Sequence, residues 1–247
     1  MLPIWVPIAF FIMALFYAMV GFGGGSSYLA ILVLVGLAYQ EIPSVALLCN
    51  IIVTAGGCWH FYRASHFRWR VILPFVICSI PMAYLGGQLL IEKKLFCLLL
   101  GFSLLCVVIR MLLPDKMFEE VKSIRTAHAW LVGIPLGAGL GFLSGLVGIG
   151  GGIFLSPLLL FLRWVRVKQA AAAASFFILV NSLSGLAGQL HKGFFNLDIL
   201  LPLALAVFVG GQIGSRLGAA HVPAIVLRKA LAMLILCASG RLLWGAL

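Results

Sequence analysis

The chain carries the glycine cluster Gly21-Phe22-Gly23-Gly24-Gly25 and repeats it as Gly148-Ile149-Gly150-Gly151-Gly152. Each cluster lies inside a long apolar stretch. Glycine disfavours a continuous helix, because it lacks the side chain that restricts its backbone. Apolar segments that are broken at corresponding places in two halves of a chain are typical of membrane proteins whose broken helices form a ligand site. The two clusters are therefore the starting point for both fold and function.

The composition indicates an integral membrane protein. Hydrophobic residues make up 64% of the 247 residues, charged residues make up 9%, and the mean hydropathy is +1.20. A chain with so little polar surface cannot cover a soluble globule. The apolar runs lack the alternation of polar and apolar residues found in membrane barrels, so the predicted fold class is an all-α integral membrane protein.

The charged residues and cysteines exclude several functions. The net charge of +11 is scattered through short loops rather than gathered into a stripe, which argues against a nucleic-acid partner. The six cysteines all lie in apolar segments without a histidine at metal-ligand spacing, so we expect buried thiols and predict neither a metal site nor a cofactor.

The two halves of the chain match at several further positions. Asn50 and Asn181 are 131 positions apart, as are His60 and His191, and Gly86-Gly87-Gln88 recurs as Gly210-Gly211-Gln212 at a spacing of 124. This ordered set predicts a duplication. We expect a first transmembrane repeat at 1–113, a cytoplasmic connector at 114–129 and a second repeat at 130–247. The expected apolar segments are 3–37, 43–62, 71–91, 95–113, 130–164, 170–190, 199–217 and 225–247.

Basic residues favour one topology for these segments. A single crossing needs about 20 residues, and segments 3–37 and 130–164 are too long for one crossing and short for two. If each is a hairpin without a net crossing, lysines and arginines divide 13 to 4 between the two sides; if each crosses once, they divide 9 to 8. The uneven division fits the positive-inside rule. We therefore predict two inverted repeats, each a glycine-broken helical hairpin plus three transmembrane helices.

The glycine turns are the candidate substrate site. Without Cβ atoms they let a ligand approach the backbone, and the helix starts after them offer amide donors and partial positive charge to an anion. Tight helix packing is the alternative role for such glycines. Polar residues at matching positions complete the candidate set. It comprises Gly23, Gly24, Gly25, Ser26, Ser27, Asn50, Gly150, Gly151, Gly152, Ile153, Asn181, Gln88 and Gln212.

The asparagines, histidines and carboxylates refine this hypothesis. Asn50 and Asn181 sit inside apolar helices, where each must find either a helix partner or a ligand. His60 and His191 fall near helix ends, where they could act as gates, as proton-responsive groups or as interfacial anchors. No carboxylate lies deep in an apolar segment. An anionic substrate is therefore favoured by elimination.

The chain resembles the TauE/SafE family of bacterial membrane transporters, also called sulfite exporters or the toluene-sulfonate uptake permease family. The resemblance is carried by Gly21-Phe22-Gly23-Gly24-Gly25-Ser26 and, more closely, by the segment from Gly145 to Pro157, with Ala30 where the second motif has Pro157. It implies a multi-pass protein of the bacterial cytoplasmic membrane that moves, often outward, sulfite, organosulfonates or related small anions. The particular anion, the direction, the coupling ion and a homodimeric state stay open.

Two other functions compete with a secondary transporter. A passive anion channel would use the same broken helices and backbone donors. An intramembrane serine protease would need a nucleophile and a base, and Ser144 and His191 are the available pair, but Phe142 stands where a GxSG motif requires glycine. We therefore do not expect an enzyme.

Overall fold

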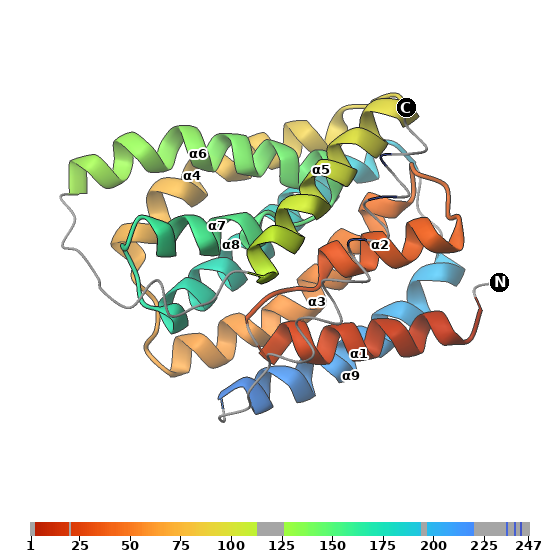
Figure 1. Cartoon of the computed structure of the whole chain (residues 1–247), viewed down its shortest axis with the longest axis horizontal. Coiled ribbons are helices and arrows are strands. Elements are labelled where there is room, and N and C mark those ends of the chain that lie inside the picture. Colours follow the sequence, from red (N-terminus) through yellow and green to blue (C-terminus); the bar gives the residue numbers. More distant parts are fainter. Residues whose placement is uncertain are drawn as a thin grey trace.

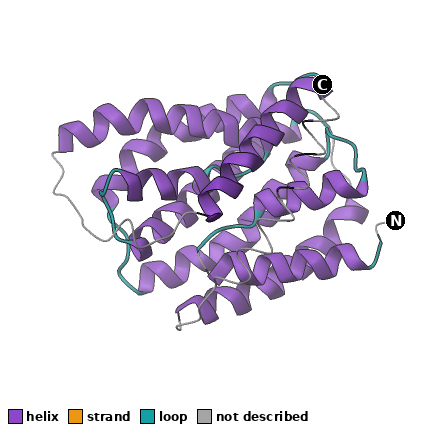
Figure 2. Ribbon diagram, viewed as in Figure 1, coloured by secondary structure: helices purple, strands orange, loops and turns teal. Residues whose placement is uncertain are grey.

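The computed structural model describes residues 3–19, 21–112, 126–193 and 197–219, with residues 236, 240 and 243. Within these ranges the chain is helical and has no strand (Figures 1 and 2). The helices are α1 (Trp5–Met19), α2 (Gly25–Val35), α3 (Ile42–Arg63), α4 (Trp69–Gln88), α5 (Lys93–Leu112), α6 (Thr126–Val147), α7 (Gly152–Phe161), α8 (Val167–Leu190) and α9 (Leu197–Ala219). The predicted all-α membrane fold is confirmed.

Five of the described helices are long and apolar enough to cross a membrane, namely α3, α4, α6, and the main parts of α8 and α9. The helices that flank the first glycine cluster, α1 and α2, are shorter, as is α7 after the second cluster. The protein is therefore a multi-pass membrane protein. The connector between α5 and α6 and most of the last apolar segment, 225–247, lie outside the described residues, and α6 begins at Thr126, inside the range expected for the connector.

Glycines break the helices at both predicted places. Gly24 caps the start of α2 with φ 91°, and Gly151 caps the start of α7 with φ 72°. These backbone angles lie in the left-handed region, which side chains with a Cβ rarely adopt. The chain therefore changes direction at each cluster instead of continuing as one helix.

Helices of the two halves pack in reciprocal pairs (Figure 1). The fourth helix of the first half, α4, packs along α6, and its counterpart α9 packs along α1. Small residues permit the close approach. Cβ atoms added at Gly137 and Gly141 would collide with the backbone of Phe75 and Ser79 on α4, and one added at Gly214 would collide with the backbone of Leu15 on α1.

Side-chain contacts identify which loops share an end of the bundle. The rings of His128, at the start of α6, and Trp164, after α7, lie 5.9 Å apart. Arg68, before α4, donates from Nη1 to the carbonyl oxygen of Trp164 at 2.8 Å. At the other ends of α4 and α8, Lys192 Nζ donates to the Leu89 carbonyl oxygen at 2.6 Å. The chain therefore returns through α7 to the end of the bundle where α6 began.

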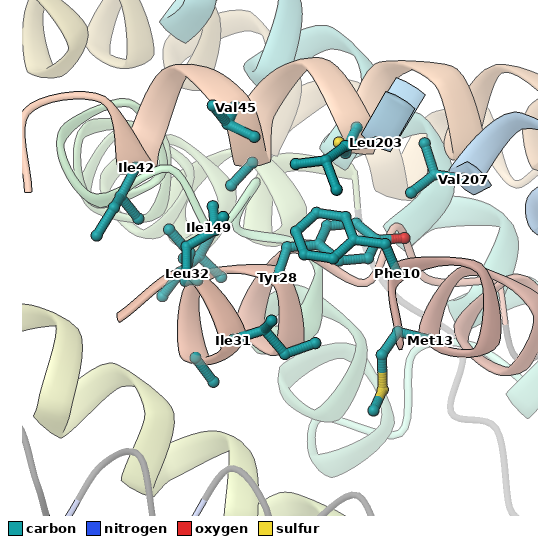
Figure 3. Close-up of a cluster of buried hydrophobic side chains, with 14 of the residues drawn as sticks. Phe10, Met13, Tyr28, Ile31, Leu32, Ile42, Val45, Ile149, Leu203 and Val207 are labelled. Carbon is teal, nitrogen blue, oxygen red and sulfur yellow. The ribbon is translucent and has the colours of Figure 1, made fainter. Parts of the chain in front are cut away.

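The larger buried cluster holds the first glycine turn in place (Figure 3). The Phe10 ring of α1 stacks on the Tyr28 ring of α2 with centroids 4.6 Å apart, and Leu203 and Val207 of α9 pack nearby. Ile149 of the second glycine turn reaches into the same cluster. Packing of this kind, rather than exclusion from water, holds helices together within a membrane.

Candidate functional site

The two glycine turns line one cavity inside the bundle. Its walls are formed by Tyr17, Phe22, Gly23, Gly24, Gly25, Ser26, Ile149, Ile153 and Ile178. Its volume, taken as the space open to the centre of a water molecule, is about 10 Å³, which is room for about one water. Segments 127 positions apart in the sequence therefore meet at this cavity.

Asn50 of α3 lies between the two turns. Its side chain is fully buried, and its Nδ2 donates to the carbonyl oxygen of Ile149 at 3.3 Å. Cβ atoms added at Gly25 and Gly150 would lie 2.5 Å and 2.9 Å from the same Nδ2. The absence of side chains at both glycines therefore makes room for this amide.

Asn181 of α8 is equally buried but has a different partner. Its Nδ2 donates to the carbonyl oxygen of Phe177 in its own helix, at 2.8 Å. The α8 side chain that hydrogen-bonds to the first glycine turn is Ser175, whose Oγ donates to the carbonyl oxygen of Gly21. Each turn is thus tied to a helix of the other half, but by different residue types.

The first turn presents several donors. The backbone amides of Gly23, Gly24 and Gly25 make no backbone hydrogen bond to another described residue, as expected where a helix begins. Ser27 Oγ donates to the Tyr17 hydroxyl at 2.9 Å, and Ser26 Oγ lies 3.3 Å from that hydroxyl. This end of α2 is suited to a negatively charged group.

Five buried polar atoms have no hydrogen-bond partner among the described residues. They are the Tyr28 hydroxyl, Asn50 Oδ1, Ser144 Oγ, Asn181 Oδ1 and Ser182 Oγ. A Cβ added at Gly24 would lie 2.7 Å from the Tyr28 hydroxyl, one at Gly150 would lie 3.2 Å from Ser182 Oγ, and one at Gly151 would lie 3.3 Å from Ser144 Cβ. Leaving such groups unpaired costs about 1–3 kcal/mol each. Four of these five residues, all but Asn181, lie at the turns, which indicates a place that receives a polar ligand or water.

The remaining predicted residues lie away from the cavity walls. Gln88 is exposed at the end of α4, and Gln212 packs its amide over Gly56 of α3. His60 is half-buried near the end of α3, whereas His191 is exposed and its Nε2 lies 3.0 Å from the Tyr84 hydroxyl. The structure does not bring these four residues to the cavity.

Besides Ser175, the buried polar residues Tyr17 and Gln189 were not singled out from the sequence. Tyr17 lines the cavity and holds the serines of α2. Gln189 donates from Nε2 to the carbonyl oxygen of Gly145 at 2.9 Å. Each is a polar residue inside an apolar segment, which was the available signal, and Tyr17 also occupies the position that matches Ser144 at the 127-residue spacing of the glycine clusters.

Neither a Ser144–His191 protease pair nor a cluster of metal ligands occurs among the described residues. Ser144 Oγ has no partner among them, and His191 is bonded to Tyr84, so the two do not form a nucleophile and base pair there. In the described part of the chain, no three His, Cys, Asp or Glu side chains come together as metal ligands.

A multi-pass helical bundle whose two broken helices meet at a small cavity is typical of the class of membrane transporters. The family model for the sulfite exporter TauE/SafE matches residues 6–242, and the chain belongs to this family.

Named relatives are consistent with that class. The chain is 34% identical over 241 residues to the probable membrane transporter protein y4hK of Sinorhizobium fredii, covering 96% of each protein. It is 25% identical to the probable membrane transporter protein YunE of Bacillus subtilis, covering 80% of this chain and 82% of the relative. A third relative, the probable membrane transporter protein MJ0441 of Methanocaldococcus jannaschii, is 25% identical over 88% of this chain and 86% of its own length. No solved structure matches the chain.

Proposed function

We propose that this membrane transporter is a secondary carrier that exports sulfite, organosulfonates or related small sulfur-containing anions across the bacterial cytoplasmic membrane. The name of the family supports the substrate class and the direction. The donor groups at the first glycine turn support an anion, because they are backbone amides and hydroxyls without a carboxylate among the cavity walls.

The observation that carries the proposal is the gathering of unpartnered polar groups at the two glycine turns. An anion between the turns would accept hydrogen bonds from the Tyr28 hydroxyl, the Ser182 hydroxyl and the free amides of the first turn. Such charge-assisted bonds offset the loss of the hydration shell. The second N–H of Asn50 Nδ2 is a further donor, since the bond to Ile149 occupies one of two.

The same proposal includes inverted repeats and alternating access. The inverted arrangement is supported by the parallel course of α6 along α4 and by the contact between the start of α6 and the end of α7. A cavity that holds about one water is smaller than a sulfur oxyanion. Substrate entry therefore requires the two turns, or the helices behind them, to move apart, as expected when one repeat rocks against the other.

Binding to purified protein tests the substrate class. A ligand that binds the folded state raises its apparent melting temperature, so sulfite, thiosulfate, sulfoacetate and taurine should be compared with chloride at equal ionic strength. We expect at least one of the sulfur-containing anions to stabilise the protein at concentrations where chloride does not. A uniform response to all salts would contradict the assignment.

Flux measurements separate a carrier from a channel. In proteoliposomes, a carrier saturates with substrate and can move it uphill when a coupled gradient is imposed, whereas a channel only dissipates the anion gradient. We expect saturating uptake that can be driven uphill. Flux that always follows the anion gradient would assign the protein to the channel class.

A further inference from the structure

The two walls of the cavity differ in chemistry. The first half contributes the Ser26 hydroxyl, the Tyr17 hydroxyl and backbone amides, together with Phe22. On the cavity wall itself the second half contributes only isoleucine side chains and backbone, through Ile149, Ile153 and Ile178, while the Ser182 hydroxyl lies beside Gly150 and outside the wall. Ser26 and Ile153 occupy the same position after their glycine clusters, 127 residues apart. The duplicated site is therefore polar on one side and apolar on the other.

The polar side is built to hold a charged group. It combines the start of α2, an 11-residue helix, with the fully buried Tyr28 hydroxyl, which has no partner among the described residues and lies against Gly24. The serines at this helix start are held by Tyr17, because Ser27 Oγ donates to the Tyr17 hydroxyl. Amides, hydroxyls and the helix dipole together favour an anionic group at this end.

The isoleucine side chains cannot solvate a charge, so the donors on this side are limited to backbone amides at the start of α7. An isoleucine side chain offers no hydrogen-bond donor, so an inorganic oxyanion in the cavity would keep some of its oxygens against hydrocarbon. Desolvating a charged oxygen without a donor is costly. An anion that carries an apolar body can instead place that body against the isoleucines and gain from its burial.

On this basis we propose that the site selects organic anions over inorganic ones, with the oxyanion group at the start of α2 and a short apolar body against Ile149, Ile153 and Ile178. This inference rests on the proposed transport function and specifies which end of the cavity recognises which part of the substrate. The cavity as it stands is too small for such a ligand. The isoleucines therefore form one face of the opened site, and the donors of α2 form the other.

A chain-length series tests the inference on the purified full-length protein. The probes are sulfite, methanesulfonate, ethanesulfonate and propane-1-sulfonate, with dissociation constants measured by calorimetry. We expect each added CH₂ group to tighten binding by about fourfold, the factor for full burial of one methylene. Sulfite should bind more weakly than propane-1-sulfonate.

Exchanging the matched residues assigns the two walls. Ile153→Ser should remove most of the gain in affinity per added methylene. Ser26→Ile should weaken the binding of all the sulfonates by a similar factor. Ile31→Ser is the matched control, because Ile31 is a buried isoleucine of α2 outside the cavity walls, and it should keep the fourfold gain. If Ile153→Ser does not fold, Ile178→Ala provides the second test of the same wall.

The outcomes separate this inference from the function beneath it. Binding of sulfonates without dependence on chain length, or an unchanged gain in both Ile153→Ser and Ile178→Ala, overturns the two-wall site and leaves anion transport standing. If none of the four probes binds, the proposed substrate class is overturned, and this inference fails with it.

Discussion

Asn50 and Asn181 occupy matching positions in the two halves, and both are completely buried, yet they do different things. Asn50 reaches across to the second glycine turn, whereas Asn181 bonds to its own helix. Ser175, rather than Asn181, links α8 to the first turn. The two halves therefore share the residue type at this position but not its partner, and the two turns are not interchangeable.

The strongest test of this comparison removes the turns themselves. Gly24→Val and Gly151→Val should each abolish transport, because both glycines have positive φ and a Cβ would lie 2.7 Å from the Tyr28 ring or 2.8 Å from the Phe177 ring. Sequence alone predicts the larger sensitivity at Gly151, whose motif is the better preserved. Transport per molecule of folded protein should be measured in proteoliposomes.

A glycine outside the turns supplies the control for these variants. Gly139 on α6 has open space at its Cβ position, so Gly139→Val should retain transport. If valine variants at Gly24 or Gly151 fold and transport normally, the turns are not part of the substrate site. Unequal loss at the two turns would measure how far their roles have diverged.

The orientation of the two halves can be tested by all-or-none labelling. We expect single cysteines in loops 63–70 and 163–168 to be protected together from an impermeant reagent on intact cells, and a cysteine at position 193 to react. The contact between Arg68 and Trp164 favours this result, because it joins the two protected loops. The background should lack the six native cysteines. Opposite labelling of the two loops would exclude inverted repeats.

The glycine breaks and the all-helical fold could be predicted from sequence because both follow from local composition. The length of α6 could not, since Pro135 and several glycines disfavour a long helix in isolation. Within the bundle, Gly137 and Gly141 instead allow α6 to pack closely on α4. Glycine thus breaks a helix at a turn, whereas at a helix contact it allows two continuous helices to pack closely.

The side-chain partners at the site were beyond sequence reasoning for a different reason. Whether Asn181 faces a turn or its own helix depends on the rotation of α8 and on a choice of rotamer, which the matching position of Asn50 does not determine. Tyr17 and Ser175 became informative only when their partners, Ser27 and the Gly21 carbonyl, were known. The sequence predicted which regions meet but not which atoms.

A smaller effect is expected when the two asparagines are exchanged for leucine. Asn50→Leu should weaken anion binding by about 1–3 kcal/mol, since it removes a donor beside both turns. Asn181→Leu should cost less, because its amide serves its own helix. Asn181→Asp should be worse than leucine if Asn181 faces the anion, since it would add like charge.

Calorimetric titration of these variants with the anion that binds most tightly decides whether each asparagine contacts the anion. Equal losses of anion affinity in Asn50→Leu and Asn181→Leu would show that the two asparagines contribute equally to binding. Unchanged binding by Asn181→Asp would make Asn181 a packing residue. A stability measurement on each variant separates loss of binding from loss of folded protein.

The smallest effect concerns the contact that joins α4 and α8 at one end of the bundle. Burial lowers the pKa of Lys192 from 10.5 to about 8, and its Nζ donates to the carbonyl oxygen of Leu89. Because the folded state binds this proton less tightly than the unfolded state, the contribution of Lys192 to stability should rise as the pH increases from about 8 to 10.5. The melting temperature of the parent, compared with that of Lys192→Gln at each pH, should increase across this window. Lys192 is about half exposed, so the shift should be small, and a constant difference between the two proteins from pH 7 to 10 would show that the ammonium is not destabilised at this contact.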